Sequence, residues 1–240
     1  MSASTTPAPT GLCLVDGLSA TPRPTIVDYC AASAEYIRQA TDLTQGRSKA
    51  AQIRLSNALA QVTLFDVRAR GPALAIAHVG EHDVGGGLRT VKADVSEMTP
   101  IDGLTLAVEL KPVHLAVGRA IWNRFGDLRT FAVNVHLKFP FAVLGGVMSI
   151  PLAERVRSND DTSWKPTAHL IERAVNRFVR AGGRQTEADA AHLLEAIGVV
   201  VFDPETGRID PDLPPPGSGL RWEELIDALA SAYDARFGMI

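Results

Sequence analysis

Asp94, Glu109 and Lys111 are the residues of this chain whose types and spacing could do chemistry. Two carboxylates held close together repel each other unless a positive charge lies between them. Mg²⁺ suits that position, because it takes oxygen ligands and is commonly bound by one or two carboxylates, with waters and phosphate oxygens completing its shell. A neighbouring lysine can orient a water or neutralise charge that grows on a phosphate. The reaction that needs this set is the hydrolysis of a phosphodiester.

A β-hairpin is the element that would bring these three side chains together. Apolar and polar residues alternate over two segments joined by the turn residues 100–103, which predicts an antiparallel pair of strands. With a four-residue turn, Thr99 pairs with Leu104, and the same register places Glu109 opposite Asp94 with Cβ atoms about 5 Å apart. The lysine two residues after Glu109 shares that face. The apolar residues of the second strand then point to the opposite face.

The elements around the hairpin predict an α/β fold. Helical spacing predicts helices over 26–40, after Ser48, and over 115–136, 167–181, 186–197 and 222–237. Short apolar runs predict strands over 73–79, 139–150 and 199–202, and the residues around 159–166 have the composition of a loop. A hairpin, a helix and an apolar strand in this order predict a crossover connection, so part of the sheet should be parallel and buried.

Asp94, followed by Glu109-Leu110-Lys111 at the end of a hairpin and then by a helix and an apolar strand, resembles the PD-(D/E)XK nuclease superfamily, which includes many type II restriction endonucleases. The resemblance covers roughly residues 26–150. It implies a restriction-endonuclease-like α/β/α core with a mixed central sheet. It also implies that Asp94 and Glu109 hold Mg²⁺, for which Mn²⁺ can substitute, and that Lys111 assists the attacking water.

The same resemblance suggests further site residues. Part of the family carries an additional acid on the first core helix, and Glu35 is the candidate here. The family pattern places a proline next to the first acid, so Asp102, which follows Pro100, is an alternative to Asp94. We favour Asp94, because an Asp-Gly pair within a turn already has a structural role. The segment 80–83 could form a small metal or acid–base cluster, although a polar loop is the simpler interpretation.

The charge distribution indicates where a DNA partner would bind. The net charge is −3, but residues up to Arg184 carry 21 Lys and Arg against 16 Asp and Glu, whereas the rest of the chain carries 3 against 11. The candidate contacts to DNA are Arg119, Asn123 and Arg124, which lie just after the predicted catalytic strand. The arginines 173, 177 and 180 also recur on one helical face, where they could bind phosphates or simply face solvent.

Three regions follow from these observations: a flexible lead over 1–24, a nuclease core over 25–184, and an acidic helical extension over 185–240 packed on the core. No apolar run reaches the length of a membrane span. The two cysteines, Cys13 and Cys30, match no zinc site or disulfide scaffold, so the cytoplasm is the expected compartment.

The predicted function is a Mg²⁺-dependent endonuclease that cuts double-stranded DNA at a specific site. Cutting both strands of a palindrome requires two active sites, so a homodimer is expected. Two alternatives remain open from the sequence. One is a nuclease subunit of a repair or multi-subunit defence complex, and the other is a non-catalytic nucleic-acid-binding domain of the same fold.

Overall fold

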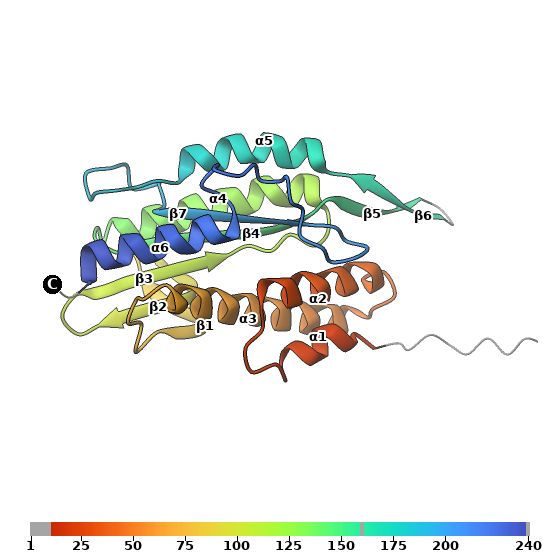
Figure 1. Ribbon diagram of the computed structural model, residues 1–240, viewed down its shortest axis with the longest axis horizontal. Helices are drawn as coiled ribbons and strands as arrows, with labels where there is room; N and C mark the ends of the chain where they lie inside the picture. The colour runs from red at the N-terminus through yellow and green to blue at the C-terminus, as the bar shows by residue number, and fades with distance from the viewer. Residues whose placement is uncertain (1–10, 159–160, 239–240) are drawn as a thin grey trace, which may run out of the picture.

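One mixed β-sheet lies between two layers of helices (Figure 1). The computed structural model describes residues 11–158 and 161–238. The helices are α1 (Cys13–Leu18), α2 (Ile26–Gln39), α3 (Gln45–Ala69), α4 (Val117–His136), α5 (Ala168–Phe178) and α6 (Trp222–Phe237), with a 3-10 turn, η1 (Val179–Ala181), after α5. The strands are β1 (His78–Gly85), β2 (Thr90–Thr99), β3 (Gly103–Leu110), β4 (Val143–Pro151), β5 (Ala153–Ser158), β6 (Asp161–Pro166) and β7 (Ala196–Phe202). The α/β class predicted from the sequence is confirmed.

The five strands of the main sheet lie in the order β1-β2-β3-β4-β7. Strand β2 runs antiparallel to both β1 and β3, whereas β3, β4 and β7 are parallel. Helix α4 makes the connection from β3 to β4, as the order of hairpin, helix and apolar strand predicts. Within the described ranges, no helix combines the length and apolar character that crossing a bilayer requires.

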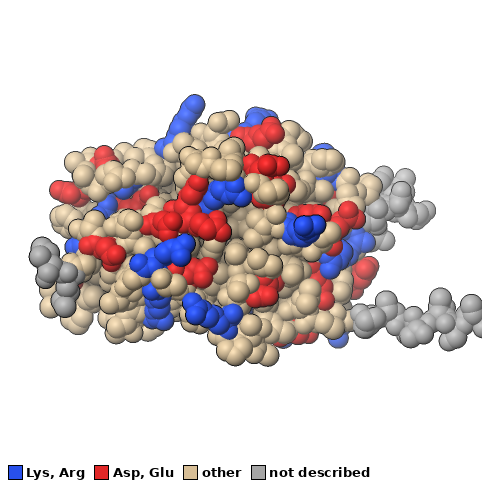
Figure 2. All heavy atoms as spheres, in the orientation of Figure 1, with Lys and Arg blue, Asp and Glu red and all other residues tan. Residues whose placement is uncertain are grey.

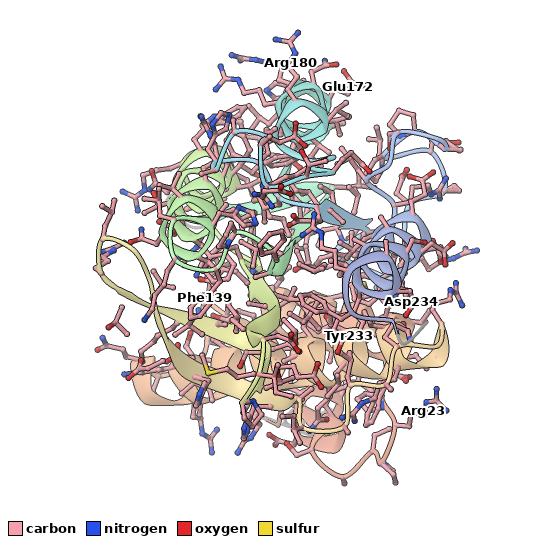
Figure 3. All side chains as sticks on the ribbon, turned by 90° about the vertical axis from the view of Figure 1, so that its left-hand side faces the viewer. Arg23, Phe139, Glu172, Arg180, Tyr233 and Asp234 are labelled. Carbon is pink, nitrogen blue, oxygen red and sulfur yellow. The ribbon has the colours of Figure 1, made fainter. Side chains whose placement is uncertain are left out.

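Each face of the sheet has its own apolar core. Helices α1, α2, α3 and α6 cover one face, and α4 and α5 cover the other (Figures 1 and 3). All nine residues of β4 are buried, as expected for a parallel strand covered on both sides. A Cβ on Gly145 would lie 3.1 Å from Leu229 of α6, and one on Gly146 would lie 3.1 Å from Leu128 of α4. Both helices therefore pack directly on the backbone of β4.

The expected flexible lead contains a packed helix. Residues 1–10 of the lead lie outside the described residues, but residues 13–18 form α1. Val15 is fully buried and Leu18 nearly so, because α1 packs against α2 and α3. A helix of six residues depends on such packing, since its own hydrogen bonds are too few to stabilise it.

Two sequence predictions of local structure are wrong. In the predicted strand 73–79, residues 73–77 are irregular with a turn at 75–76, and β1 starts only at His78. The carbonyl of Leu74 accepts hydrogen bonds from the Arg68 guanidinium instead of a neighbouring strand. The predicted helix 186–197 is absent. The carboxylate of Asp189 accepts from the backbone amides of residues 185 and 186, both at 2.9 Å, as Asp28 does from Thr25 at the start of α2, but here turns follow instead of a helix.

The acidic segment 185–240 contributes more than the expected helices. It supplies the edge strand β7, which pairs with β4, as well as α6. Of the region around 159–166, expected to be a loop, residues 159–160 lie outside the described residues, and residues 161–166 form β6, which pairs with β5. This hairpin also supports α4, because the Glu154 carboxylate accepts a hydrogen bond of 2.8 Å from the amide of Val117 at the start of that helix.

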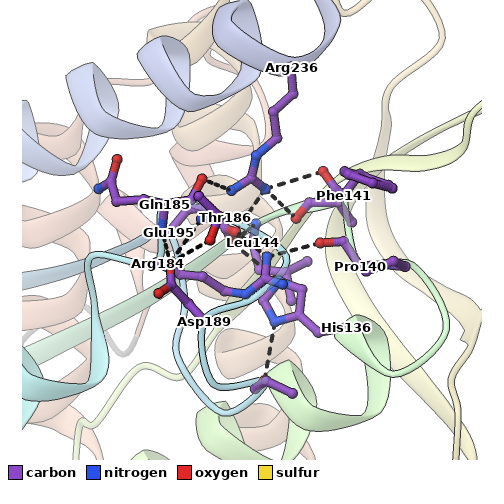
Figure 4. A network of polar contacts seen from close by, with 12 residues as sticks. His136, Pro140, Phe141, Leu144, Arg184, Gln185, Thr186, Asp189, Glu195 and Arg236 are labelled. Atoms are coloured by element: carbon purple, nitrogen blue, oxygen red, sulfur yellow. Dashed lines mark hydrogen bonds and ion pairs between the residues drawn. The ribbon is translucent and has the colours of Figure 1, made fainter.

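A buried ion network joins the acidic segment to the rest of the sheet (Figure 4). Oε1 of Glu195 lies 3.0 Å from Nη1 of Arg184 and 2.8 Å from Nη1 of Arg236, while Oε2 accepts from the amide of Leu144 at 2.8 Å. Burial alone would raise the pKa of Glu195, but contacts with His136, the Leu144 amide and Arg236 outweigh it and lower the pKa. The network fixes α6 and the chain before β7 against the first residues of β4.

The outer face of α6 is not uniformly acidic. Figure 2 shows acidic and basic side chains mixed across the face on which this helix lies in front. Asp227 of α6, for example, pairs with Arg70 at 2.5 Å. The acidic excess of the C-terminal segment is therefore partly balanced by arginines of other elements and partly buried with Glu195.

Gly207 offers a test of how the turn after β7 packs. Its φ is +76°, and an added Cβ would lie 2.6 Å from the Cα of Ala31 in α2. We expect Gly207→Ala to lower the free energy of unfolding by about 3 kcal/mol, from left-handed strain and overpacking together. Gly217→Ala, at φ +77° with nothing nearby, should cost only the strain, about 1 kcal/mol. Urea denaturation measures both, and equal losses would contradict the close approach to α2.

Candidate active site

The hairpin of β2 and β3 has the register that the site requires. Val95 lies opposite Val108, and continuing this pairing by one residue places Asp94 opposite Glu109, as predicted. The pairing near the turn differs from the prediction, because Thr99 pairs with Gly103 rather than with Leu104. Gly103 adopts φ +71°, which permits a three-residue turn.

A bulge in β3 compensates for the shorter turn. Glu97 pairs with Leu106 but Met98 pairs with Leu104, so Thr105 is the extra residue. The bulge restores the residue that the turn omits, and the register at Asp94 is the one expected for the longer turn. Bulges of this kind re-aim side chains because they shift the alternation of one strand against its partner.

Asp94 is held by the backbone of the neighbouring strand. Its Oδ2 accepts a hydrogen bond of 2.7 Å from the amide of Leu110. The described pairs between β2 and β3 start at Val95. Beyond that pair, the Asp94 carboxylate accepts the hydrogen bond from the Leu110 amide that a backbone carbonyl of β2 would otherwise accept. Burial raises the pKa of Asp94, although the Leu110 amide and the charge of Lys111 act in the opposite direction. The strand thus fixes this carboxylate in a partly desolvated position.

Glu109 and Lys111 form an ion pair at the end of β3. The side chain of Glu109 is 10% exposed and that of Lys111 is 20% exposed. Burial raises the pKa of Glu109 to about 7, despite the nearby ammonium, and the charge of Asp94 adds to the increase. The pair therefore contains a carboxylate that is costly to ionise and that would gain from a further cation.

Two hollows meet at Lys111. The larger one is a cleft of about 780 Å³ that Asp94 and Lys111 line, with α3 as one wall and the start of α4 as another. The smaller one, about 340 Å³, is lined by Glu109 and Lys111 together with Asp127 and Phe131 of α4. The three predicted catalytic residues are thus brought together, with the lysine at the junction and one carboxylate in each hollow.

The alternative and additional acids lie elsewhere. Asp102 lies in the turn, exposed, where it exchanges hydrogen bonds of 2.9 and 3.1 Å with Thr99. It is separated from Lys111 by the length of β3, about 25 Å. Glu35 accepts from the amides of Leu14 and Val15 at 2.8 and 3.1 Å and so caps α1. The structure does not bring either acid to the two hollows.

Among the predicted DNA-binding residues, Arg124 lines the cleft. Arg119 and Asn123 are exposed on α4 and are not among the described lining of either hollow. The arginines of the second predicted stripe lie on α5 and η1, in the same layer as α4 but not among the described lining of either hollow. Arg180 lies on the outer side of the layer formed by α5 (Figure 3), and the guanidinium of Arg177 stacks 4.5 Å from the ring of Trp122.

Two further residues contribute to the cleft. Glu81 belongs to the segment 80–83, whose simpler interpretation was a polar loop; it lies in β1 and lines the cleft where the register against β2 shifts between Val79 and His82. His114, just before α4, is buried at the cleft wall, and burial lowers its pKa to about 4. Its Nε2 lies 3.4 Å from the hydroxyl of Tyr29. The imidazole is therefore neutral at ordinary pH.

A polar stripe along one face of α3 is the sequence signal that could have predicted the cleft. Lining residues of α3 recur at 49, 52, 53, 56 and 57, which is one face of a helix. Ile53 is apolar, yet it is 52% exposed and lines the cleft with these polar residues. A scan for polar periodicity, rather than for apolar periodicity alone, could have identified this face.

The donor set fits a hard divalent cation. Within the described residues, no hydrogen bond reaches Oδ1 of Asp94 or Oε2 of Glu109, so each carboxylate keeps an oxygen for a ligand. The described chain brings together no cluster of three histidine, cysteine or acidic side chains suited to a metal. Two carboxylates supplemented by water are nevertheless a common arrangement for Mg²⁺.

A scan against protein-family models, a search of curated proteins and a search of solved structures each return no match for this chain. Its function is therefore argued from the geometry of the site.

The raised pKa of Glu109 has a consequence for stability. The folded protein binds a proton at Glu109 more tightly than the unfolded chain, so stability is lost as pH rises from about 4.5 through about 7. Glu109→Gln cannot ionise. We expect its free energy of unfolding, relative to wild type, to rise by up to about 3 kcal/mol between pH 5 and pH 8.

Urea denaturation at the two pH values measures this difference. The pKa of about 7 already includes the attraction of Lys111, so the lost ion pair adds no further pH-dependent cost to the variant. Glu187→Gln, at an exposed glutamate, serves as the control and should follow the wild-type pH dependence. A Glu109→Gln variant that also follows it would show that Glu109 is not a desolvated acid.

Proposed function

We propose that this protein is a Mg²⁺-dependent endonuclease that hydrolyses DNA phosphodiester bonds, in the manner of a type II restriction enzyme. One observation carries the proposal: the β2–β3 hairpin places Asp94, held by the Leu110 amide, beside the Glu109–Lys111 ion pair where two hollows meet. The same hairpin is followed by α4 and the parallel strand β4, the element order on which the resemblance to PD-(D/E)XK nucleases rests.

Asp94 and Glu109 are the residues that would hold the cation. When bound, Mg²⁺ lowers the pKa of a bound water and stabilises negative charge on a phosphate. Leu110 orients the Asp94 carboxylate through its amide, so one acid is fixed before any ligand arrives. Lys111 neutralises negative charge at the junction of the hollows, where a scissile phosphate would lie.

The substrate would enter through the cleft. Arg124 and Lys111 line it from different elements, and both offer positive charge to a phosphate backbone. None of its described lining comes from the acidic segment 185–240. Cutting both strands of a duplex requires two such sites, so a homodimer is part of the proposal.

Plasmid cleavage tests the catalytic assignment. With Mg²⁺ present, we expect Asp94→Ala and Lys111→Ala to lower the rate of supercoiled plasmid cleavage at least 100-fold, since each removes a charge on which phosphate chemistry depends. Asp102→Ala is the matched control, because this acid lies in the turn, and it should keep most of the wild-type rate. Gel electrophoresis of the products gives the rates.

Full activity in the Asp94 variant would refute the assignment of this acid. If wild type cleaves no plasmid, binding of Mn²⁺ distinguishes an enzyme whose DNA sequence is absent from the plasmid from a non-catalytic domain without a metal site. Calorimetric titration should then show a site that Asp94→Ala abolishes and Asp102→Ala preserves. Absence of such binding in wild type would contradict the proposed metal site.

A further inference from the structure

The cleft beside the proposed catalytic residues has two chemically different walls. Both acids among its described lining, Glu81 and Asp94, come from strands. The wall formed by α3 carries no carboxylate among the residues described there; its lining residues are Lys49, Gln52, Ile53, Ser56 and Asn57. One cation, two carboxamides, a hydroxyl and an exposed apolar side chain therefore face the space next to the catalytic edge.

This composition suits a strand of nucleic acid. A lysine contacts phosphates, whereas carboxamides present a donor and an acceptor together, the pattern that pairs with the edge of adenine in the major groove. An exposed apolar group such as Ile53 can contact a thymine methyl. Lys49 on α3, Lys111 after β3 and Arg124 on α4 surround the cleft with positive charge, which complements a polyanion.

Gln52 differs from the rest of this wall because its amide is already oriented. Its Nε2 donates to the hydroxyl of Tyr36 at 2.8 Å, and that hydroxyl shares a further hydrogen bond of 2.8 Å with Oγ of Ser48. Tyr36 is fully buried, so its ring is fixed by packing. Of the two carboxamides, only Gln52 has a hydrogen bond within the described residues that sets its orientation.

We propose that Gln52 is a specificity-determining residue that pairs with an adenine edge of duplex DNA in the cleft, and that Tyr36 positions it. The inference rests on the proposed function for the identity of the occupant. A side chain oriented before binding loses less conformational entropy when the base arrives, and it discriminates against bases whose edge lacks the matching groups. Carboxamide–adenine pairing is the strongest match that a glutamine offers.

A randomised duplex library tests the proposal in two arms. In the first, wild type and variants cleave the library with Mg²⁺, and sequencing of the ends gives the preference at each base pair. In the second, Ca²⁺ replaces Mg²⁺, and duplexes retained in a gel shift are sequenced. We expect Gln52→Ala to reduce the preference for adenine at one base pair about tenfold or more. Tyr36→Phe should reduce it about threefold at the same base pair only.

The control is Gln61→Ala, which truncates an exposed glutamine of the same helix outside the cleft and should keep the wild-type profile. Gln52→Glu provides a second variant, since it keeps the shape of the side chain and replaces its donor. Thermal denaturation verifies that each variant is folded. A change confined to one base pair distinguishes base recognition from a general loss of structure, which would lower binding to all sequences.

The outcomes separate this inference from the proposed function. If wild type binds selectively without cleaving, and Gln52→Ala removes the selection, the recognition role stands and the nuclease proposal fails. If wild type cleaves and the Gln52 variants keep its sequence profile, the recognition role is overturned and the nuclease stands. Binding of the library without preference by wild type, or no binding at all, also overturns the role of Gln52.

Discussion

The register between β2 and β3 is the constraint on which the candidate site depends. Side chains alternate along a strand, so a slip of one residue would turn Glu109 and Lys111 to the opposite face. The extra residue in β3 at Thr105 compensates for the three-residue turn and keeps Asp94 opposite Glu109. The apolar residues that alternate with the site residues hold this register, since they are buried against α3 and α6 on the opposite face.

Burial raises the pKa of both carboxylates of the site, because it makes their ionised forms less stable. Glu109 is paired with a single lysine, and its pKa is raised because desolvation outweighs that pairing. Glu195 shows the opposite result within the same sheet. It is surrounded by two guanidiniums, a histidine and a backbone amide, and its pKa is lowered. The difference between the two buried acids follows from their partners, because one lysine offsets less of the desolvation of Glu109 than the several donors around Glu195 offset there.

The arrangement of layers explains why the cleft has an acid-poor wall. Helix α3 packs its apolar side under β1, β2 and β3 and leaves its polar face beside the end of β3. The acidic C-terminal segment meets α3 near the opposite end, where the indole of Trp222 donates to Asp66 at 2.8 Å. The net charge of −3 therefore says little about the cleft. None of the described lining of the cleft comes from the segment 185–240, which carries the acidic excess.

The hairpin, the α4 connection from β3 to β4, the α/β class and the register of Asp94, Glu109 and Lys111 could be predicted from the sequence. The reason is that alternation along strands and helical spacing are local properties of the chain. The sequence did not determine the turn at Asp189, the first residue of β1 or the role of Glu35, whose hydrogen-bond partners Leu14 and Val15 lie on another helix. The cleft, the neutral His114 and the oriented Gln52 arose only from tertiary structure. Each depends on side chains of α2 or α3 meeting the end of β3. The polar stripe on α3 is periodic in the sequence, but only the fold brings it next to the end of β3.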